Sequence, residues 1–271
     1  MPELPEVETT RLGLVPRVVG YPLERVEIRN DRLRWPVDSV ALRSCLGQSI
    51  TAIDRRAKYL LFFWSNQKVM LVHLGMSGSL RLSLPEAPVR PHDHVFWSLN
   101  ALDVRYHDPR RFGSILFTGD DWQNHPLLLH LGVEPLSSDW NEAYLWQHSR
   151  NKQVSIKALL MNQRIVVGVG NIYAQEALFA AGIYPAKPAG QLSHGDVECL
   201  VPAVTDQLQH ALRVGGSSLR DYVHGHGETG YFQLQLKVYG RKGKLCPDCG
   251  AALQTVRIVG RSTTWCPVCQ T

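Results

Sequence analysis

Four cysteines near the C-terminus have the spacing of a metal site. They stand in CPDCGAALQTVRIVGRSTTWCPVC, where two C-x2-C pairs are sixteen residues apart: Cys246, Cys249, Cys266 and Cys269. Each pair can direct two thiolates at one tetrahedral Zn²⁺, and the residues between the pairs fit a β-hairpin with Gly260 in its turn. A redox role for one C-x-x-C pair is the alternative, but the second pair and the absence of a βαβ pattern argue against it. We therefore predict one structural zinc ion.

The opening stretch MPELPEVETT also contains residues that could do chemistry. Removal of the initiator Met would leave Pro2 as a free secondary amine with Glu3 beside it. A terminal amine, with a pKa of roughly 7.7–8, can act as a nucleophile. The same prolines and carboxylates also suit the first turn of a helix, where a missing N–H costs little and negative charge is favoured. The stretch alone leaves both interpretations open.

Other motifs place charged, aromatic or sulfur-containing side chains at turns. Lys58 in RRAKYL lies in an apolar run, where it either faces solvent on a strand or exchanges protons in a cleft. Met76 in HLGMSGSL stands at a glycine-flanked turn and could insert between base pairs. Arg110 and Phe112 in DPRRFG combine a cation with a stacking ring on a loop. In other proteins such loops are usually only solvated turns.

Three further motifs suggest ligand contacts. His92 and His94 in HDHV could ligate a metal, although no partner ligands are evident. The glycines of VVGVG precede a helical pattern that begins near Asn171, and backbone N–H groups at a helix start form an anion site. The glycine-rich VHGHGETGYF is typical of a lid over a ligand or of a disordered loop.

These residues must be positioned by two kinds of structure. After an opening helix near residues 5–20, seven or so short runs alternate or are apolar over about 100 residues, which predicts an antiparallel sandwich or barrel. Helices are expected at about 139–149, 154–161, 170–181 and 193–213, the first opened by a capping box of Asp139 and Glu142. The two helices around 154–161 and 170–181 suggest a helix-turn-helix variant that binds phosphate.

The composition is that of a globular protein with a basic balance. The 271 residues include 29 Lys+Arg against 24 Asp+Glu, and the pI is near 8.9, which favours a polyanionic partner without proving one. There is no run of about 18 apolar residues, and the acidic N-terminus is unlike a signal peptide. We therefore expect a cytoplasmic protein with no membrane partner, in which Cys45 and Cys199 are ordinary core residues.

Taken in order, the motifs resemble those of a known family. PELPEVET, RRAKYL, HLGMSGSL, HDHV, DPRRFG, VVGVGNIYA, YGRKG and the four-cysteine tail are similar to bacterial formamidopyrimidine-DNA glycosylases essentially from Pro2 to Gln270. The resemblance implies an α+β multidomain protein. It would have an N-terminal antiparallel β-sandwich with an N-terminal helix, a helical domain with a helix-two-turn-helix, and a zinc β-hairpin held by four cysteines. The implied boundaries are 1–132, a linker at 133–138, 139–237 and 238–271.

The resemblance also implies an activity and its residues. The family excises 8-oxoguanine and formamidopyrimidines from double-stranded DNA and then cleaves the strand by β,δ-elimination. We expect a monomer, because one lesion needs one cleft and the sequence shows no dimerisation pattern. Carried across by motif, the catalytic residues are the nucleophile Pro2, which forms a Schiff base, the acid/base Glu3, and Lys58 and Arg261, which assist elimination. The implied DNA-binding residues are Met76, Arg110 and Phe112, which fill the gap of the flipped nucleotide, and His92, Lys152 and Asn171. The loop from Ser217 to Tyr231 would close over the damaged base. SRNKQVSIK has fewer lysines than this motif usually has, which suggests a weaker backbone contact.

Two other functions compete with this one. An endonuclease VIII-like glycosylase would use the same Pro-Glu start and zinc tail on oxidised pyrimidines, but Leu4, the PEVET continuation and the Met-Arg-Phe set fit the purine enzyme better. A zinc-containing DNA-binding protein without catalysis would explain the charge and the cysteines. It would not explain Pro2 and Glu3 together with Lys58.

Overall fold

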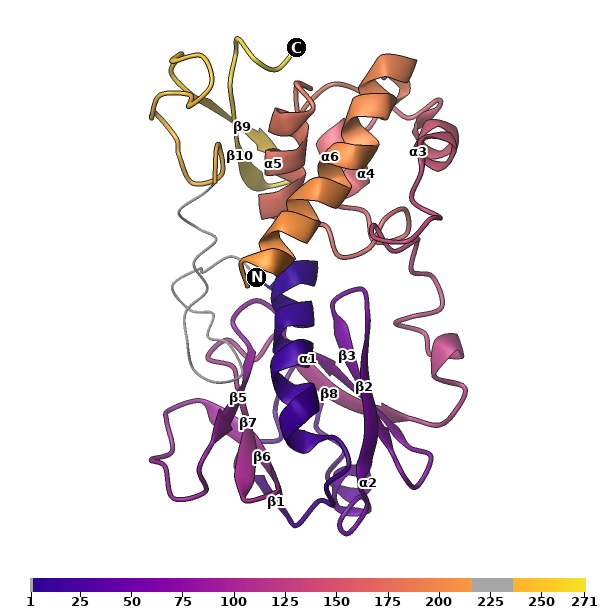
Figure 1. The fold of residues 1–271 in the computed structure, drawn as a ribbon, viewed down its shortest axis with the longest axis vertical. Coiled ribbons are helices and arrows are strands. Elements are labelled where there is room, and N and C mark those ends of the chain that lie inside the picture. The colour runs from indigo at the N-terminus through magenta and orange to yellow at the C-terminus, as the bar shows by residue number, and fades with distance from the viewer. Residues whose placement is uncertain (1, 216–235) are drawn as a thin grey trace. The chain divides into compact units, whose positions relative to one another are not determined.

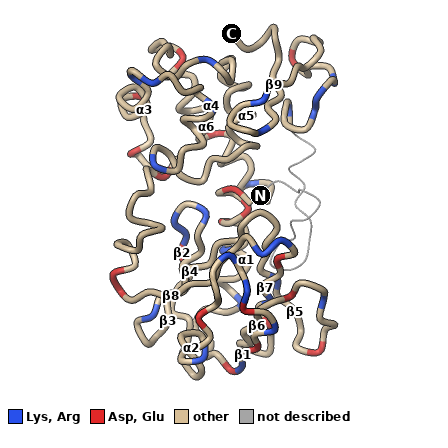
Figure 2. The backbone as a smooth tube through the Cα atoms, turned by 180° about the vertical axis from the view of Figure 1, so that it is seen from behind, with Lys and Arg blue, Asp and Glu red and all other residues tan. Residues whose placement is uncertain are grey.

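The computed structural model describes residues 2–215 and 236–271, and the predicted lid at 217–231 lies outside the described residues. The described chain forms two compact units, which we treat separately. The N-terminal unit contains residues 2–129 and 214–215, and the C-terminal unit contains 130–213 and 236–271. Among the described residues, no helix combines the length and apolar character that a membrane-spanning helix requires. Lys and Arg occur in both units, and in each unit Asp and Glu are interspersed among them along the chain (Figure 2).

The N-terminal unit is built on two four-stranded antiparallel sheets (Figure 1). One sheet has the order β1 (Arg25–Ile28), β6 (Asp93–Leu99), β7 (Leu102–His107), β5 (Ser79–Ser83). The other has the order β2 (Ile50–Arg56), β3 (Tyr59–Trp64), β4 (Val69–His73), β8 (Ser114–Thr118). Apolar side chains of both sheets form one core, in which the rings of Phe62 and Trp97 meet edge to face with centroids 6.0 Å apart. The predicted sandwich is confirmed.

Helix α1 (Leu4–Val18) packs into this core through Val7, Leu14 and Val18. It begins as the sequence predicts, with Pro5 in its first turn, where the missing N–H leaves no helical bond unmade. Two short elements of this unit, α2 (Ser39–Arg43) and the 3₁₀ turn η1 (Trp122–Asn124), were not expected. Five residues or fewer are too short to show a helical period.

The C-terminal unit contains helices and one hairpin. Its elements are α3 (Glu142–Ser149), α4 (Ile156–Leu160), α5 (Asn171–Ala180), η2 (Ala189–Gln191), α6 (His194–Arg213), β9 (Gln254–Ile258) and β10 (Arg261–Trp265). The expected capping box of α3 is wrong in detail, because the side chain of Asn141 accepts the hydrogen bond from Tyr144 N and Asp139 lies outside the helix. The hairpin turns at Val259 and Gly260, both with positive φ (47° and 71°), as a two-residue turn matched to strand twist requires.

The two cysteines outside the C-terminal motif differ. Cys45 is fully buried in the N-terminal core, as expected. Cys199 on α6 is exposed, so its assignment to the core is wrong. On an amphipathic helix of twenty residues, a single cysteine at an uncertain register does not show which face it occupies.

Candidate active site and metal centre

The amino-terminal turn buries its polar residues. Pro2 is buried, and Glu3 and Glu6 are only 1% and 2% exposed. The two residues form a reciprocal capping box at the start of α1: the backbone N–H of Glu3 donates to Oε2 of Glu6 at 2.8 Å, and the Glu3 side chain accepts the backbone N–H of Glu6. Glu3 thus serves the helix start and also places a buried carboxyl directly after Pro2.

Glu8 joins α1 to the neighbouring strand. Its carboxylate accepts hydrogen bonds from Arg11 at 2.7 Å and from Arg55 on β2 at 3.1 Å. Burial would raise the pKa of Glu8, but the hydrogen bonds and charges of Arg11 and Arg55 lower it. Arg55 also donates to the carbonyl of Ala57 at 2.9 Å. The helix that carries Pro2 and Glu3 is thus tied to the turn that carries Lys58.

Lys58 lies in the turn between β2 and β3 and is 6% exposed. The solvated-strand interpretation is therefore wrong, because the residue is in a turn and is buried. The preceding Ala57 has a φ of +54°, so the chain reverses over two residues and Tyr59 pairs directly with Arg56. This tight turn sets the position of the lysine side chain more firmly than an open loop would.

A cavity of about 390 Å³ in the N-terminal unit brings two predicted residues together. Met76 and Phe112 line it with Arg34, His73 and Gly75. Burial lowers the pKa of His73 to about 4, and the nearby charges of Lys58 and Arg34 act in the same direction. Its Nδ1 accepts the N–H of Gly75 at 3.0 Å, so the ring is neutral with its proton on Nε2. His73 was not predicted from the sequence, where its place before the LGM turn was its only signal.

Replacing His73 by asparagine is expected to weaken the pH dependence of stability. The pKa of His73 is about 4 in the folded protein, against 6.5 for an unperturbed histidine in the unfolded chain. Between these two pH values only the unfolded state binds the proton, so the free energy of unfolding falls as the pH is lowered. Between pH 7 and pH 5 this loss amounts to about 2 kcal/mol. Urea unfolding at both pH values should show that the free energy of unfolding of His73→Asn falls by that much less than the free energy of unfolding of the wild type. Equal losses in both proteins would contradict a neutral His73 in the folded protein.

Two loops of the candidate site are held together by Asp108, which is fully buried. Its carboxylate accepts the hydroxyl of Ser77 at 2.7 Å, the N–H of Gly113 at 2.9 Å and the N–H of Arg110 at 3.3 Å. The turn at Gly75 packs so closely on the second loop that a Cβ there would lie 2.4 Å from the nitrogen of Gly113. Sequence reasoning missed Asp108, because an Asp-Pro pair in a loop is usually only a turn signal.

The side chains on these loops are exposed. Phe112 is 46% exposed, and the Arg110 guanidinium lies 4.8 Å from the centre of its ring. His92 is also exposed, with a φ of +70° that is uncommon outside glycine, and its carbonyl accepts the N–H of Asp108 at 3.1 Å. Loops that are held rigidly and carry an exposed cation and an exposed ring can approach stacked nucleobases and phosphates. His92 is linked through Asp108 to the same loops.

In the C-terminal unit, buried Lys157 connects predicted Asn171 to the strand that begins with predicted Arg261. Its Nζ donates to Oδ1 of Asn171 at the start of α5 and to Oγ1 of Thr263 on β10, both at 2.6 Å. Because Oδ1 of Asn171 accepts from Lys157, the Nδ2 group is the donor end of this side chain. Arg261 begins β10 two residues before Thr263 and is exposed. A lysine in SIKALL gave no sign of burial in the sequence.

Gln175 makes a second connection between α5 and the hairpin. Its Oε1 accepts the N–H of Thr264 at 2.7 Å, and its Nε2 donates to the carbonyl of Ser262 at 3.4 Å. The hairpin is therefore fixed to the helix that begins with Asn171. Lys152 is exposed, and its carbonyl accepts the N–H of Gly190 at 2.8 Å, so its backbone is held while its side chain faces solvent.

The four cysteines of the tail form one cluster. Their sulfur atoms all lie within 4.8 Å of one another, with Cys246 and Cys269 at 3.9 Å and Cys249 and Cys266 at 3.4 Å. Zn–S bonds of about 2.3 Å separate the sulfurs of a tetrahedron by about 3.8 Å, so these residues fit one zinc ion. Burial would raise the pKa of Cys266, but backbone N–H groups and the other thiols lower it to about 7, whereas hydrogen bonds from the other thiols raise the pKa of Cys269, so Cys266 loses its proton before Cys269.

Comparison with known proteins identifies the family. Three family models match along the chain: the formamidopyrimidine-DNA glycosylase N-terminal domain over residues 1–115, the H2TH domain of the same enzymes over 131–223, and a zinc finger found in FPG and IleRS over 243–271. The chain belongs to the formamidopyrimidine-DNA glycosylase family. Curated members from Acidithiobacillus ferrooxidans and Marinobacter nauticus are 50% and 48% identical over 271 residues, covering 100% of each chain.

Solved structures of family members have the same fold. The MutM (Fpg) protein of Thermus thermophilus matches with a TM-score of 0.89 and 40% identity over 99% of this chain and 98% of that one. A variant of Lactococcus lactis Fpg in complex with Fapy-dG-containing DNA matches with a TM-score of 0.93 and 36% identity over 100% of both chains. Lactococcus lactis Fpg with abasic-site DNA gives a TM-score of 0.92, with 36% identity over 99% of both. The predicted zinc and fold are confirmed at the level of the family.

Proposed function

We propose that the protein is a bifunctional DNA glycosylase and abasic-site lyase that repairs oxidised purines in double-stranded DNA. The observation that supports this most strongly is the amino-terminal turn, where a buried carboxyl follows a proline whose nitrogen becomes a free amine after Met1 is removed. Family membership and the DNA in the Lactococcus lactis complexes, which contains Fapy-dG in one and an abasic site in another, support formamidopyrimidines and abasic sites as substrates. We include 8-oxoguanine on the resemblance of the sequence motifs alone. Because its substrate is chromosomal DNA, the protein would act at the bacterial nucleoid, and it would act as a monomer.

In this proposal the lone pair of the Pro2 nitrogen attacks C1′ of the flipped nucleotide. The glycosidic electron pair leaves with the base, and Glu3 would carry the proton released by the Pro2 nitrogen to that base. The C1′–O4′ bond then breaks and O4′ takes up a proton, which Glu3 would also supply. Because proline is a secondary amine, the ring-opened adduct is an iminium that has no N–H to lose. It draws electrons from C2′, so loss of a C2′ proton expels the 3′ phosphate, and a second elimination expels the 5′ phosphate. Lys58 and Arg261 would assist these eliminations.

The remaining predicted residues would bind the DNA. Met76, Arg110 and Phe112 would fill the gap left by the flipped nucleotide, a use that suits exposed side chains on loops made rigid by Asp108. His92, Lys152 and Asn171 would contact phosphates. A zinc ion held by the four cysteines would fix the hairpin that carries Arg261 and take no part in the reaction. The proposed domains remain 1–132, a linker at 133–138, 139–237 and 238–271.

Borohydride trapping on a duplex with one 8-oxoguanine opposite cytosine tests this proposal. The protein should carry no N-terminal tag, so that Pro2 can become the terminus. A covalent adduct that maps to Pro2 would support the iminium and the purine assignment. Trapping only on a thymine glycol duplex would move the protein to the endonuclease VIII-like alternative. Binding without trapping on either duplex would favour the non-catalytic alternative.

A further inference from the structure

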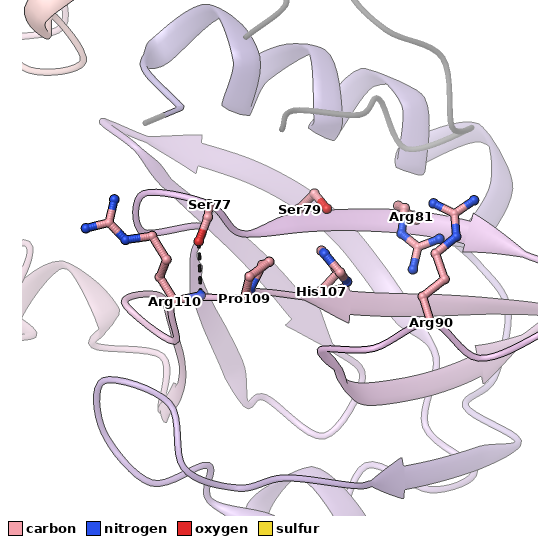
Figure 3. A pocket seen from close by; sticks show the side chains of 7 residues that line it. All are labelled: Ser77, Ser79, Arg81, Arg90, His107, Pro109 and Arg110. Carbon is pink, nitrogen blue, oxygen red and sulfur yellow. Dashed lines mark hydrogen bonds between the residues drawn. The ribbon is translucent and has the colours of Figure 1, made fainter. Parts of the chain in front are cut away.

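A second pocket, of about 340 Å³, lies on the sheet that contains β5 and β7. Leu80 and Tyr106 on these strands point into the core, so alternation places Ser79, Arg81 and His107 on the opposite face. These three side chains line the pocket together with Ser77, Arg90, Pro109 and Arg110, so none of its lining residues is acidic. Figure 3 shows them in a row, with Arg110 and Ser77 at one end, Arg81 and Arg90 at the other, and Ser79 and His107 between.

A buried carboxylate, Asp93, organises the base of this pocket. It accepts hydrogen bonds from the guanidinium of Arg81, from Nδ1 of His107 at 3.0 Å and from the backbone N–H of Arg90 at 3.0 Å. Burial would raise the pKa of Asp93, but these hydrogen bonds and the Arg81 charge lower it to about 2. Asp93 therefore holds Arg81 and His107 in one orientation and stays charged, without lining the pocket itself.

The groups that remain for a ligand are donors. The Arg90 and Arg110 side chains are exposed and make no ion pair among the described residues. Ser79 is only 2% exposed, yet its hydroxyl has no hydrogen-bond partner within the part of the chain that the structure describes. Ser77 instead gives its proton to Asp108 and accepts the N–H of Arg110 at 3.2 Å. Three guanidiniums against one carboxylate at the base favour an anion with several acceptor oxygens, which is the chemistry of a phosphate.

We propose that this pocket binds a backbone phosphate of the DNA duplex, away from the lesion nucleotide. The inference rests on the proposed function, because it takes duplex DNA as the partner. Arg110 supports this choice over a free phosphate ion, since it belongs both to the pocket and to the loop that carries Phe112. A strand that meets this loop would pass the open side of the pocket, and Arg90 extends the row of cations along the sheet (Figure 3).

Replacing Arg90 by alanine tests the pocket without disturbing its base, because only the backbone of Arg90 binds Asp93. The probe is a duplex with a tetrahydrofuran abasic analogue, and the dissociation constant is measured by fluorescence anisotropy from about 50 to 200 mM salt. The loss of one phosphate contact should weaken binding about tenfold at low salt. It should also reduce the slope of log Kd against log salt by about 0.9. Arg29→Ala is the matched control, since Arg29 is an exposed arginine beside β1 of the same sheet and, among the described residues, its side chain pairs with partly exposed Glu27 alone.

A phosphate scan then identifies the contact. Methylphosphonates placed one at a time in the same duplex should include one position that weakens wild-type binding but leaves Arg90→Ala unaffected. The pocket assignment is overturned if Arg90→Ala keeps the wild-type salt slope, or if no position separates the two proteins. A third result would also overturn it: inorganic phosphate raises the melting temperature of the wild type but not of Arg90→Ala, while the methylphosphonate scan is the same for the two proteins. The ligand would then be a free phosphate ion. Borohydride trapping of the wild type in parallel tests the proposed function separately from the pocket.

Discussion

Replacing Glu3 by glutamine is expected to lower the rate of 8-oxoguanine excision by about 10²- to 10⁴-fold, the usual contribution of a general acid/base. Glutamine has nearly the same shape, but it cannot carry the proton that must move when the base leaves. The fold should survive, because the Glu3 side chain acts in the capping box as an acceptor of the backbone N–H of Glu6, and glutamine keeps an acceptor oxygen at that place. Single-turnover excision with the protein in excess over duplex measures the chemical step directly.

The same variant should retain much of its cleavage at a preformed abasic site. There the sugar is already an aldehyde, so the Pro2 amine forms the iminium without expelling a base, and the step that needs Glu3 is bypassed. Glu24→Gln is a suitable control, since Glu24 is an exposed carboxylate of the same unit and should excise at the wild-type rate. Wild-type excision by Glu3→Gln would remove Glu3 from the mechanism. An equal loss on both substrates would point to a defect in DNA binding or in the Pro2 amine instead.

Local patterns predicted the parts of this protein that depend on local geometry. The two C-x2-C pairs could be assigned to one metal site because each pair lies in one turn and the hairpin between them closes at Val259 and Gly260. Pro5 and the acidic residues gave the start of α1 for the same reason. The strands were recognisable because alternation along each strand follows from having one face in the core.

The residues that sequence reasoning missed are polar groups buried by distant partners. Asp108 binds Ser77, thirty-one positions away, and Lys157 binds Thr263, one hundred and six positions away. Nothing near either residue in the sequence reveals the partner. Lys58 was found by its motif, but its tight turn was not, because Ala57 adopts a left-handed conformation that alanine rarely takes. The register of pairing between β2 and β3 imposes that turn.

Replacing Cys249 by serine is expected to remove the zinc and weaken DNA binding about 100-fold. Loss of one thiolate leaves three ligands for an ion that structural sites hold with four. The local core cannot replace the metal, because Cys246 and Cys266 are themselves members of its small buried cluster with Phe179, Val238 and Leu253. If the hairpin loosens, Arg261 loses its position and Thr263 no longer holds Lys157 against Asn171. Two lost charged contacts, each of about 1.5 kcal/mol, give a factor of this size.

Metal content by mass spectrometry and binding to the tetrahydrofuran duplex measure the two effects in one preparation. Cys199→Ser is the matched control, because Cys199 is an exposed thiol on α6 outside the cluster and should leave one zinc per chain and the wild-type affinity. Loss of zinc with unchanged affinity would separate the metal from DNA binding and leave Arg261 without its proposed support. A full zinc content in Cys249→Ser would contradict the four-cysteine site itself, since three thiols and a serine hydroxyl should not hold the ion through purification.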